Sequence, residues 1–190
     1  MSNLSLAIGI AASLLTGQQG SSENQVQVDS KPIHVQFVKS LTGHNVTVSI
    51  DGKKPRMTFA GKLGFTDGNR TWQSVCADVR SPIAESQRFT VKPGDSKAAG
   101  GNLALAGNIV AKYFNAAKTP DQCAALQLAV WEAVEDGGPH ANFAAGRFRA
   151  QSGGNILDMA SDLYESLFEA GQAALLTSQE GGQSQLSSRN

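Results

Sequence analysis

The spacing of apolar residues changes once along the chain, and this change constrains the fold more than any other feature. Between residues 33 and 92, apolar residues alternate with polar ones, which is typical of strands with one buried face. Examples are Ile33, Val35, Phe37, Val46, Val48 and Ile50. After residue 101 the apolar residues recur every three to four positions, which is typical of helices. The sequence therefore predicts an α+β chain, with strands first and helices after.

Turn signals divide the alternating region into about five short strands. Gly, Asn and Asp gather at 42–45, 51–55 and 66–69, and the last two contain the Asp-Gly pair that favours tight antiparallel turns. The predicted strands cover 33–38, 46–50, 56–65, 71–79 and 87–92. Short strands joined by such turns favour an antiparallel β-sandwich or partial barrel.

A Gly-rich hinge at 93–101 precedes a predicted helical subdomain of about three helices. The first helix covers 103–115. The third runs from Ile156 to Leu176, with Asn155 as its N-cap.

The second helix has the clearest boundaries. Thr119 is suited to the N-cap, Pro120 to the first helical position, and Gln122 completes a capping box. The Asp136-Gly137 step should end the helix.

The two ends of the chain differ in composition from the middle. The apolar run 4–15 resembles the core of a signal peptide, although the first basic residue is Lys31; a buried or swapped helix is the alternative. Residues 178–190 are rich in Gly, Ser and Gln, which is typical of a flexible tail. The expected organisation is a signal-like or disordered segment at 1–25, one domain at 26–177 and a tail at 178–190. Within the domain, the β part covers 31–92 and the helical part 102–177.

Charge and composition exclude several classes of partner. Sixteen basic and sixteen acidic residues cancel, so no overall positive field favours nucleic acid. No apolar run reaches the roughly 20 residues of a membrane-spanning helix. The two cysteines and three histidines are too few and too scattered for a zinc site at the usual spacing, so we expect no metal.

Gln127 is unusual because it falls within the apolar stripe of the second helix. Residues 124–126 and 128–131 around it are all apolar. A buried amide without partners costs about 1–3 kcal/mol, so something should satisfy it. Two interpretations are open: the amide is hydrogen-bonded to the backbone of the β half, or its carbonyl carbon is used in a covalent bond.

Two motifs resemble those of a known family. The helix carries Leu126-Gln127-Leu128-Ala129-Val130-Trp131, and a strand carries Val75-Cys76-Ala77-Asp78. The chain resembles the thioester domains of bacterial surface proteins, in which a strand Cys followed shortly by Asp pairs with a Gln in a Φ-Gln-x-Ala-Φ-Trp motif. The resemblance covers residues 59–176 in the same order of elements.

The resemblance implies an internal thioester between Cys76 and Gln127. A thiol held against the Gln carbonyl can displace ammonia and store an activated acyl group. An amine on a partner, such as a protein lysine, then takes the acyl group as a stable amide without any cofactor. Trp131 and Trp72 are suited to exclude water from the bond, and Asp78 to orient the strand or assist proton transfer.

These implications give a secreted or surface-displayed adhesin-like domain as the leading hypothesis. Cys123 departs from the family, since it lies one turn before Gln127 and offers a competing Cys76–Cys123 disulfide. The alternative is a non-reactive extracellular binding or matrix domain with that disulfide or with free thiols. A hydrolase using Cys76 is a weaker hypothesis, because none of His34, His44 and His140 has a catalytic setting. We therefore expect no enzymatic turnover.

Overall fold

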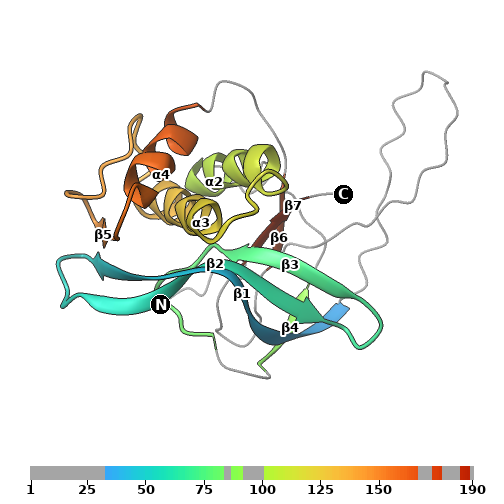
Figure 1. The fold of residues 1–190 in the computed structure, drawn as a ribbon. Helices are drawn as coiled ribbons and strands as arrows, with labels where there is room; N and C mark the ends of the chain where they lie inside the picture. Colours follow the sequence, from blue (N-terminus) through green and yellow to red (C-terminus); the bar gives the residue numbers. More distant parts are fainter. Residues whose placement is uncertain (1–32, 84–86, 92–100, 167–172, 177–184, 189–190) are drawn as a thin grey trace, which may run out of the picture.

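The structure is a computed structural model that describes residues 33–83, 87–91, 101–166, 173–176 and 185–188. The predicted α+β class is confirmed, and the strands and helices alternate more than expected along the second half of the chain (Figure 1). In chain order the elements are β1 (Ile33–Ile50), β2 (Arg56–Thr66), β3 (Thr71–Cys76), β4 (Arg88–Val91), α2 (Gly101–Tyr113), α3 (Pro120–Glu135), β5 (Phe148–Gln151), α4 (Ile156–Glu165), β6 (Ala173–Leu176) and β7 (Gln185–Ser188).

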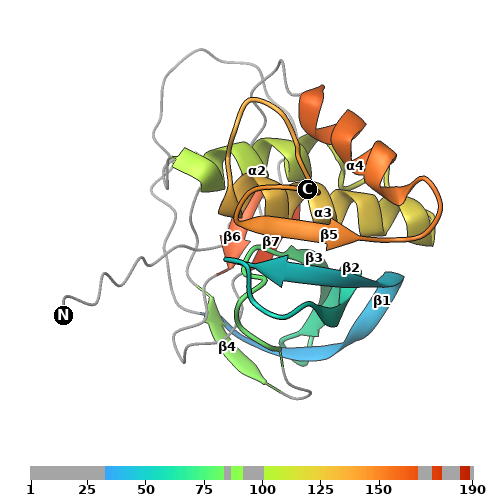
Figure 2. The ribbon, with the colours of Figure 1, turned by 90° about the vertical axis from the view of Figure 1, so that its left-hand side faces the viewer.

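The strands form one antiparallel sheet with the order β4-β1-β2-β3-β7-β6, and β5 pairs with the far end of β1. Figures 1 and 2 both place α2, α3 and α4 on the same side of β1–β3. Helix α3 lies against β1, β2 and β3, and α2 and α4 flank it. The core fills the space between α3 and the sheet, so the residues at its centre come from both halves of the chain.

Strand β1 is continuous where the sequence predicted a turn at 42–45. The β1–β2 register shifts at Ser40/Gly43, and Gly43 then pairs with Gly61. The two backbones approach so closely that a Cβ on Gly43 would lie 2.1 Å from the Ala60 carbonyl oxygen. Glycine at 43 therefore serves a close approach of the bulged strand β1 to β2 rather than a chain reversal.

Gly61→Ala is expected to lower the free energy of unfolding by about 3 kcal/mol. The new Cβ would lie 2.3 Å from the Thr42 carbonyl oxygen, and the φ of Gly61 is +152°, a conformation that L residues rarely adopt. Gly64→Ala on the same strand is the matched control. Its Cβ would make an ordinary 3.5 Å contact with Leu41, so we expect a change of about 1 kcal/mol at most. Urea unfolding measures the free energy of unfolding of both variants. An equal decrease in the two would contradict this prediction.

Helix α3 begins and ends as its sequence predicted. The Thr119 side chain accepts a hydrogen bond from the Gln122 backbone, the Gln122 side chain completes the capping box, and Asp136 is the C-cap. The helix is buried on nearly all sides, from Cys123 to Ala133. An apolar helix of this kind is stable only when it is covered all around, which fixes its central place between the sheet, α2 and α4.

The third predicted helix is shorter than expected. Helix α4 ends at Glu165, and residues 173–176 form β6 instead of its last turn. A short apolar run such as Ala-Ala-Leu-Leu is compatible with a helix or a strand. Here its pairing with β7 stabilises the strand. Asn155 is at the N-cap, but its side chain makes no capping hydrogen bond. The predicted strand 71–79 also ends early, at Cys76.

The predicted tail at 178–190 is wrong for residues 185–188. They form β7, in which Leu186 is completely buried and pairs with Val75 of β3. The sequence did not predict this strand, because Leu186 is a single apolar residue among polar ones. The strand forms because the edge of β3 offers backbone hydrogen-bonding partners to the segment. The predicted segment at 1–25 and most of the hinge at 93–101 lie outside the described residues. Among the described helices, none combines the length and apolar character needed to cross a bilayer.

Candidate functional site

Cys76 and Gln127, which are 51 residues apart in sequence, meet in the core. Cys76 is the last residue of β3 and Gln127 lies in the middle of α3; they are 2 % and 1 % exposed. The Cys76 backbone N–H donates to Gln127 Oε1 at 2.7 Å, and Gln127 Nε2 donates to the Cys76 carbonyl oxygen at 2.7 Å. The amide is thus hydrogen-bonded to the backbone of the β half, which was the first of the two interpretations open from the sequence.

The paired hydrogen bonds also fix the Gln127 carbonyl beside the residue that carries the thiol. The N–H of Cys76 donates to the carbonyl oxygen, so it polarises the carbonyl in the direction that a nucleophilic attack requires. The same residue supplies both this donor and the sulfur. The arrangement can therefore satisfy a buried amide or prepare its carbonyl carbon for acyl transfer.

The Cys76 thiol is buried among groups that hold its position. Its Sγ–H donates to the Asp78 carbonyl oxygen at 3.0 Å. Burial raises the pKa of the Cys76 thiol to about 12, and the side chain of Trp131 and the backbone of Asp78 partly oppose this shift. The sulfur is therefore a neutral thiol at neutral pH, and it must lose its proton in any reaction as a nucleophile.

Trp131 lies one helical turn after Gln127 and is 1 % exposed. Its ring packs edge-on against Phe148 of β5. The indole Nε1 is buried with no hydrogen-bond partner among the described residues. The Trp131 side chain lowers the pKa of the Cys76 thiol, against the larger effect of burial, so the two side chains lie near each other. The role of Trp131 in excluding water from the bond stays a prediction.

Trp72 and Asp78 have more ordinary surroundings than Trp131. Trp72 is half-buried near the start of β3, opposite Phe65. The Asp78 carboxylate accepts hydrogen bonds from the backbone N–H groups of Arg80 (2.8 Å) and Ser81 (3.3 Å), which stabilises the turn after β3. The contact of Asp78 with the thiol is made by its backbone carbonyl.

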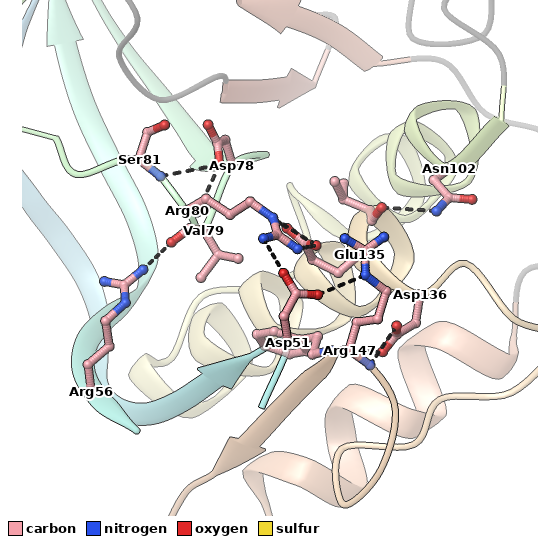
Figure 3. Close-up of polar contacts among 12 residues, drawn as sticks. Asp51, Arg56, Asp78, Val79, Arg80, Ser81, Asn102, Glu135, Asp136 and Arg147 are labelled. Carbon is pink, nitrogen blue, oxygen red and sulfur yellow. Dashed lines mark hydrogen bonds and ion pairs between the residues drawn. The ribbon is translucent and has the colours of Figure 1, made fainter. Parts of the chain in front are cut away.

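A network of charged side chains fastens the segment after Cys76 to the end of α3 (Figure 3). Arg80 Nη2 lies 2.5 Å and its Nε 2.9 Å from the Glu135 carboxylate, and Arg80 Nη1 lies 2.6 Å from Asp51. Arg147 Nε contacts Asp51 at 2.9 Å. Hydrogen bonds from Arg80 and then Arg147 lower the pKa of Asp51 to about 2. This network holds the Cys76 strand in register with the Gln127 helix, and nothing in the sequence pattern indicated it.

Cys123 does not share the surroundings of Cys76, and both are free thiols. Its Sγ–H is directed to the Ala117 carbonyl oxygen at 3.6 Å, which also accepts a hydrogen bond from Lys62 Nζ at 2.7 Å. The Cys76–Cys123 disulfide that the sequence left as an alternative is therefore not formed in the structure.

Glu132, which follows Trp131 on α3, is a charged residue in the core and is only 2 % exposed. Its Oε1 accepts a hydrogen bond from the Asn142 backbone N–H at 2.8 Å, and its Oε2 is buried with no hydrogen-bond partner among the described residues. Burial raises the pKa of Glu132 from its usual 4.5 to about 6, the hydrogen bond from Asn142 opposes the shift, and Asp136 adds to it. The carboxylate anchors the loop that follows α3.

The raised pKa of Glu132 predicts a pH dependence of stability. Because the folded chain holds this proton more tightly than the unfolded chain, the free energy of unfolding falls as pH rises from about 4.5 to about 6. The loss should be about 2 kcal/mol. Glu132→Gln keeps an oxygen that can accept from the Asn142 N–H but cannot titrate, so its free energy of unfolding should not show this loss. Denaturant unfolding of both chains at pH 4.5 and pH 7 measures the difference. A variant with the same pH dependence as the parent chain would contradict the assignment.

The described histidines have partners away from Cys76. His44 Nε2 lies 2.6 Å from Asp121, and His140 Nδ1 lies 3.7 Å from Glu165. His34 is exposed on β1. The contacts of His44 and His140 lie away from Cys76, and the hydrolase hypothesis stays an untested prediction. Within the part of the chain that the structure describes, no group of three or more potential metal ligands gathers.

No family model, curated protein or solved structure matches this chain. Its function has to be inferred from the residues of the site.

Proposed function

We propose that this domain forms an internal thioester between Cys76 Sγ and the side-chain carbonyl carbon of Gln127, and that it uses this bond to bind a partner amine covalently. The observation that carries the proposal is the pair of 2.7 Å hydrogen bonds between the Gln127 amide and the Cys76 backbone. They hold a buried carboxamide against the residue that carries a buried thiol. Such an arrangement supplies the proximity and orientation on which acyl transfer depends.

The bond-forming step is balanced within the two side chains. The Cys76 sulfur attacks the Gln127 carbonyl carbon, and the Cys76 N–H stabilises the negative charge that develops on Oε1. The C–N bond then breaks, and the amide nitrogen leaves as ammonia with the proton of the thiol. Trp131 supports this step, because its side chain lowers the pKa of the Cys76 thiol and so favours loss of the proton.

The capture step uses the stored acyl group once. A partner amine attacks the carbonyl carbon, an amide forms, and Cys76 is released as a thiol. The burial of both residues keeps water from the thioester until then. This chemistry suits a secreted or cell-surface adhesin-like domain whose ligand is a protein lysine, and it needs no cofactor. It is a single acyl transfer rather than enzymatic turnover.

The second candidate is a non-reactive extracellular binding or matrix domain of the same fold. The observation that favours it is that both polar atoms of the Gln127 amide are already satisfied by the Cys76 backbone, while both thiols are free. In that case Gln127 fastens α3 to β3 as an ordinary buried amide.

Intact-mass measurement of the denatured chain separates the two candidates. The thioester predicts a mass lower by one ammonia than the sequence requires. After exposure of the native protein to methylamine, a small amine able to enter a buried site, the chain should gain one methylamine. A chain with the full sequence mass that is unchanged by methylamine would refute the thioester and leave the non-reactive domain.

A further inference from the structure

Lys62 and Cys123 form a second buried pair, separate from the thioester site. Lys62, on β2, is 6 % exposed, and Cys123, in the first turns of α3, is completely buried. Both side chains donate to the same Ala117 carbonyl oxygen, Lys62 Nζ at 2.7 Å and Cys123 Sγ at 3.6 Å. An amine and a thiol that share one acceptor atom are close neighbours, and no step of the proposed function uses either.

The surroundings of Lys62 favour a reactive amine. Its Nζ lies 4.4 Å from the centre of the Phe114 ring, and no carboxylate lies within ion-pair distance of it among the described residues. Burial lowers the pKa of Lys62, and the nearby Lys118 lowers it further, while the Cys123 sulfur opposes the shift. A buried ammonium held only by a carbonyl and a ring loses its proton more readily than one at the surface, and the neutral amine is a nucleophile.

We propose that Lys62 and Cys123 form an oxidative modification site, in which a peroxide converts the pair to a covalent sulfenamide between Nζ and Sγ. The proposal is independent of the thioester, because it uses neither Cys76 nor Gln127. The link would join β2 to the start of α3 and lock the sheet to the helix that carries Gln127.

The reaction is balanced in two steps with the peroxide as the only added reactant. Hydrogen peroxide oxidises the Cys123 thiol to sulfenic acid; the O–O bond breaks, one oxygen is retained on sulfur, and one water leaves. The Lys62 amine then attacks the sulfur, the S–O bond breaks, and the hydroxyl leaves as a second water with a proton from the amine. The chain loses two hydrogens in all. A thiol reductant cleaves the S–N bond and restores both side chains while it is itself oxidised to a disulfide.

A pocket that can admit a small oxidant lies next to the neighbours of the pair. A pocket of about 290 Å³ opens between α2, α3 and α4, and Ala117 and Gln122 line it together with Tyr113, Met159 and Leu163. Ala117 is the residue whose carbonyl holds the pair, and Gln122 precedes Cys123 in sequence. Peroxide in this pocket therefore contacts the residue whose carbonyl accepts from both side chains and the residue that precedes Cys123.

The test uses the full chain with Cys76→Ser, in which neither the thioester nor a disulfide can form. Treatment with hydrogen peroxide should give a chain lighter by two hydrogens, and dithiothreitol should restore the original mass. In a tryptic digest, cleavage after Lys62 should be lost and the peptides that contain Lys62 and Cys123 should be joined. This digest needs no further variant, so it holds even where a Lys62 substitution impairs folding.

Two further variants on the same background complete the test. Lys62→Met and Cys123→Ser should each abolish the loss of two hydrogens, and the Met variant should accumulate oxygen adducts on Cys123 instead. Oxygen adducts without any joined peptide in the chain that retains Lys62 would overturn the proposal. A loss of two hydrogens that persists in Lys62→Met would also overturn it. Methylamine capture by the parent chain is measured separately, so failure of either proposal leaves the other standing.

Discussion

A Cys76→Ser variant is expected to lose covalent methylamine capture completely, whereas Cys123→Ser should keep it. Both cysteines are buried free thiols, so the two substitutions disturb the core to a similar degree. Only Cys76 exchanges hydrogen bonds with the Gln127 amide, while Cys123 faces Ala117. Intact-mass measurement with and without methylamine distinguishes them, and thermal unfolding verifies that both variants are folded.

Each variant has an outcome that opposes the thioester. If Cys76→Ser still lost one ammonia and captured methylamine, the acyl group would belong to another pair of residues. If Cys123→Ser abolished capture while Cys76→Ser did not, Cys123 would be the nucleophile. Gln127→Glu provides a further check, since a carboxylate offers no ammonia to displace and should leave the chain at its sequence mass.

Trp131→Ala is expected to lower the free energy of unfolding by about 3–5 kcal/mol. The indole is the largest fully buried side chain among the described residues, and it packs on Phe148 between α3 and β5. Its removal leaves a cavity that the surrounding helix and strands can fill only partly. Trp72→Ala is the matched control. Because Trp72 is half-exposed, this substitution should lower the free energy of unfolding by clearly less. Urea unfolding measures both, and equal losses would contradict the difference in burial.

The same variant has a functional readout. Trp131 lies beside the Cys76 sulfur, so the cavity left by Trp131→Ala would admit water to the thioester. Without amine, the thioester of folded Trp131→Ala should therefore be hydrolysed faster than that of the parent chain, which adds the mass of one water. The fraction of the chain that captures methylamine should fall by the same amount. Retention of the full ammonia deficit would show that other residues exclude water from the bond.

The sequence located the candidate pair through one anomaly and one resemblance. Gln127 is a polar residue in an apolar helix, which marks it without reference to any other protein. Cys76 breaks no local rule, and only the family-like motifs implied that it pairs with Gln127. The charged network around Arg80 and Glu135 escaped prediction, because ion pairs between distant segments leave no periodic pattern in a single sequence.

Burial of individual polar residues was the hardest property to predict. Glu132 lies next to Trp131 on a helix that is covered on nearly all sides, so its position on the helix did not identify an exposed face. Lys62 stands in an alternating strand, and only the approach of the Ala117 loop makes it a buried partner of Cys123. Both residues became buried because of elements distant in sequence.

By itself the sequence determined those features that depend on neighbours along the chain. The capping box at Thr119 and the tight Asp51-Gly52 turn both arise from local hydrogen bonding and backbone preference. The tertiary structure decided the rest: Gly43 and Gly61 allow one long strand, and β7 forms on the edge of β3. Those outcomes depend on contacts between distant segments, whose free energy exceeds the weak local preference of the residues involved.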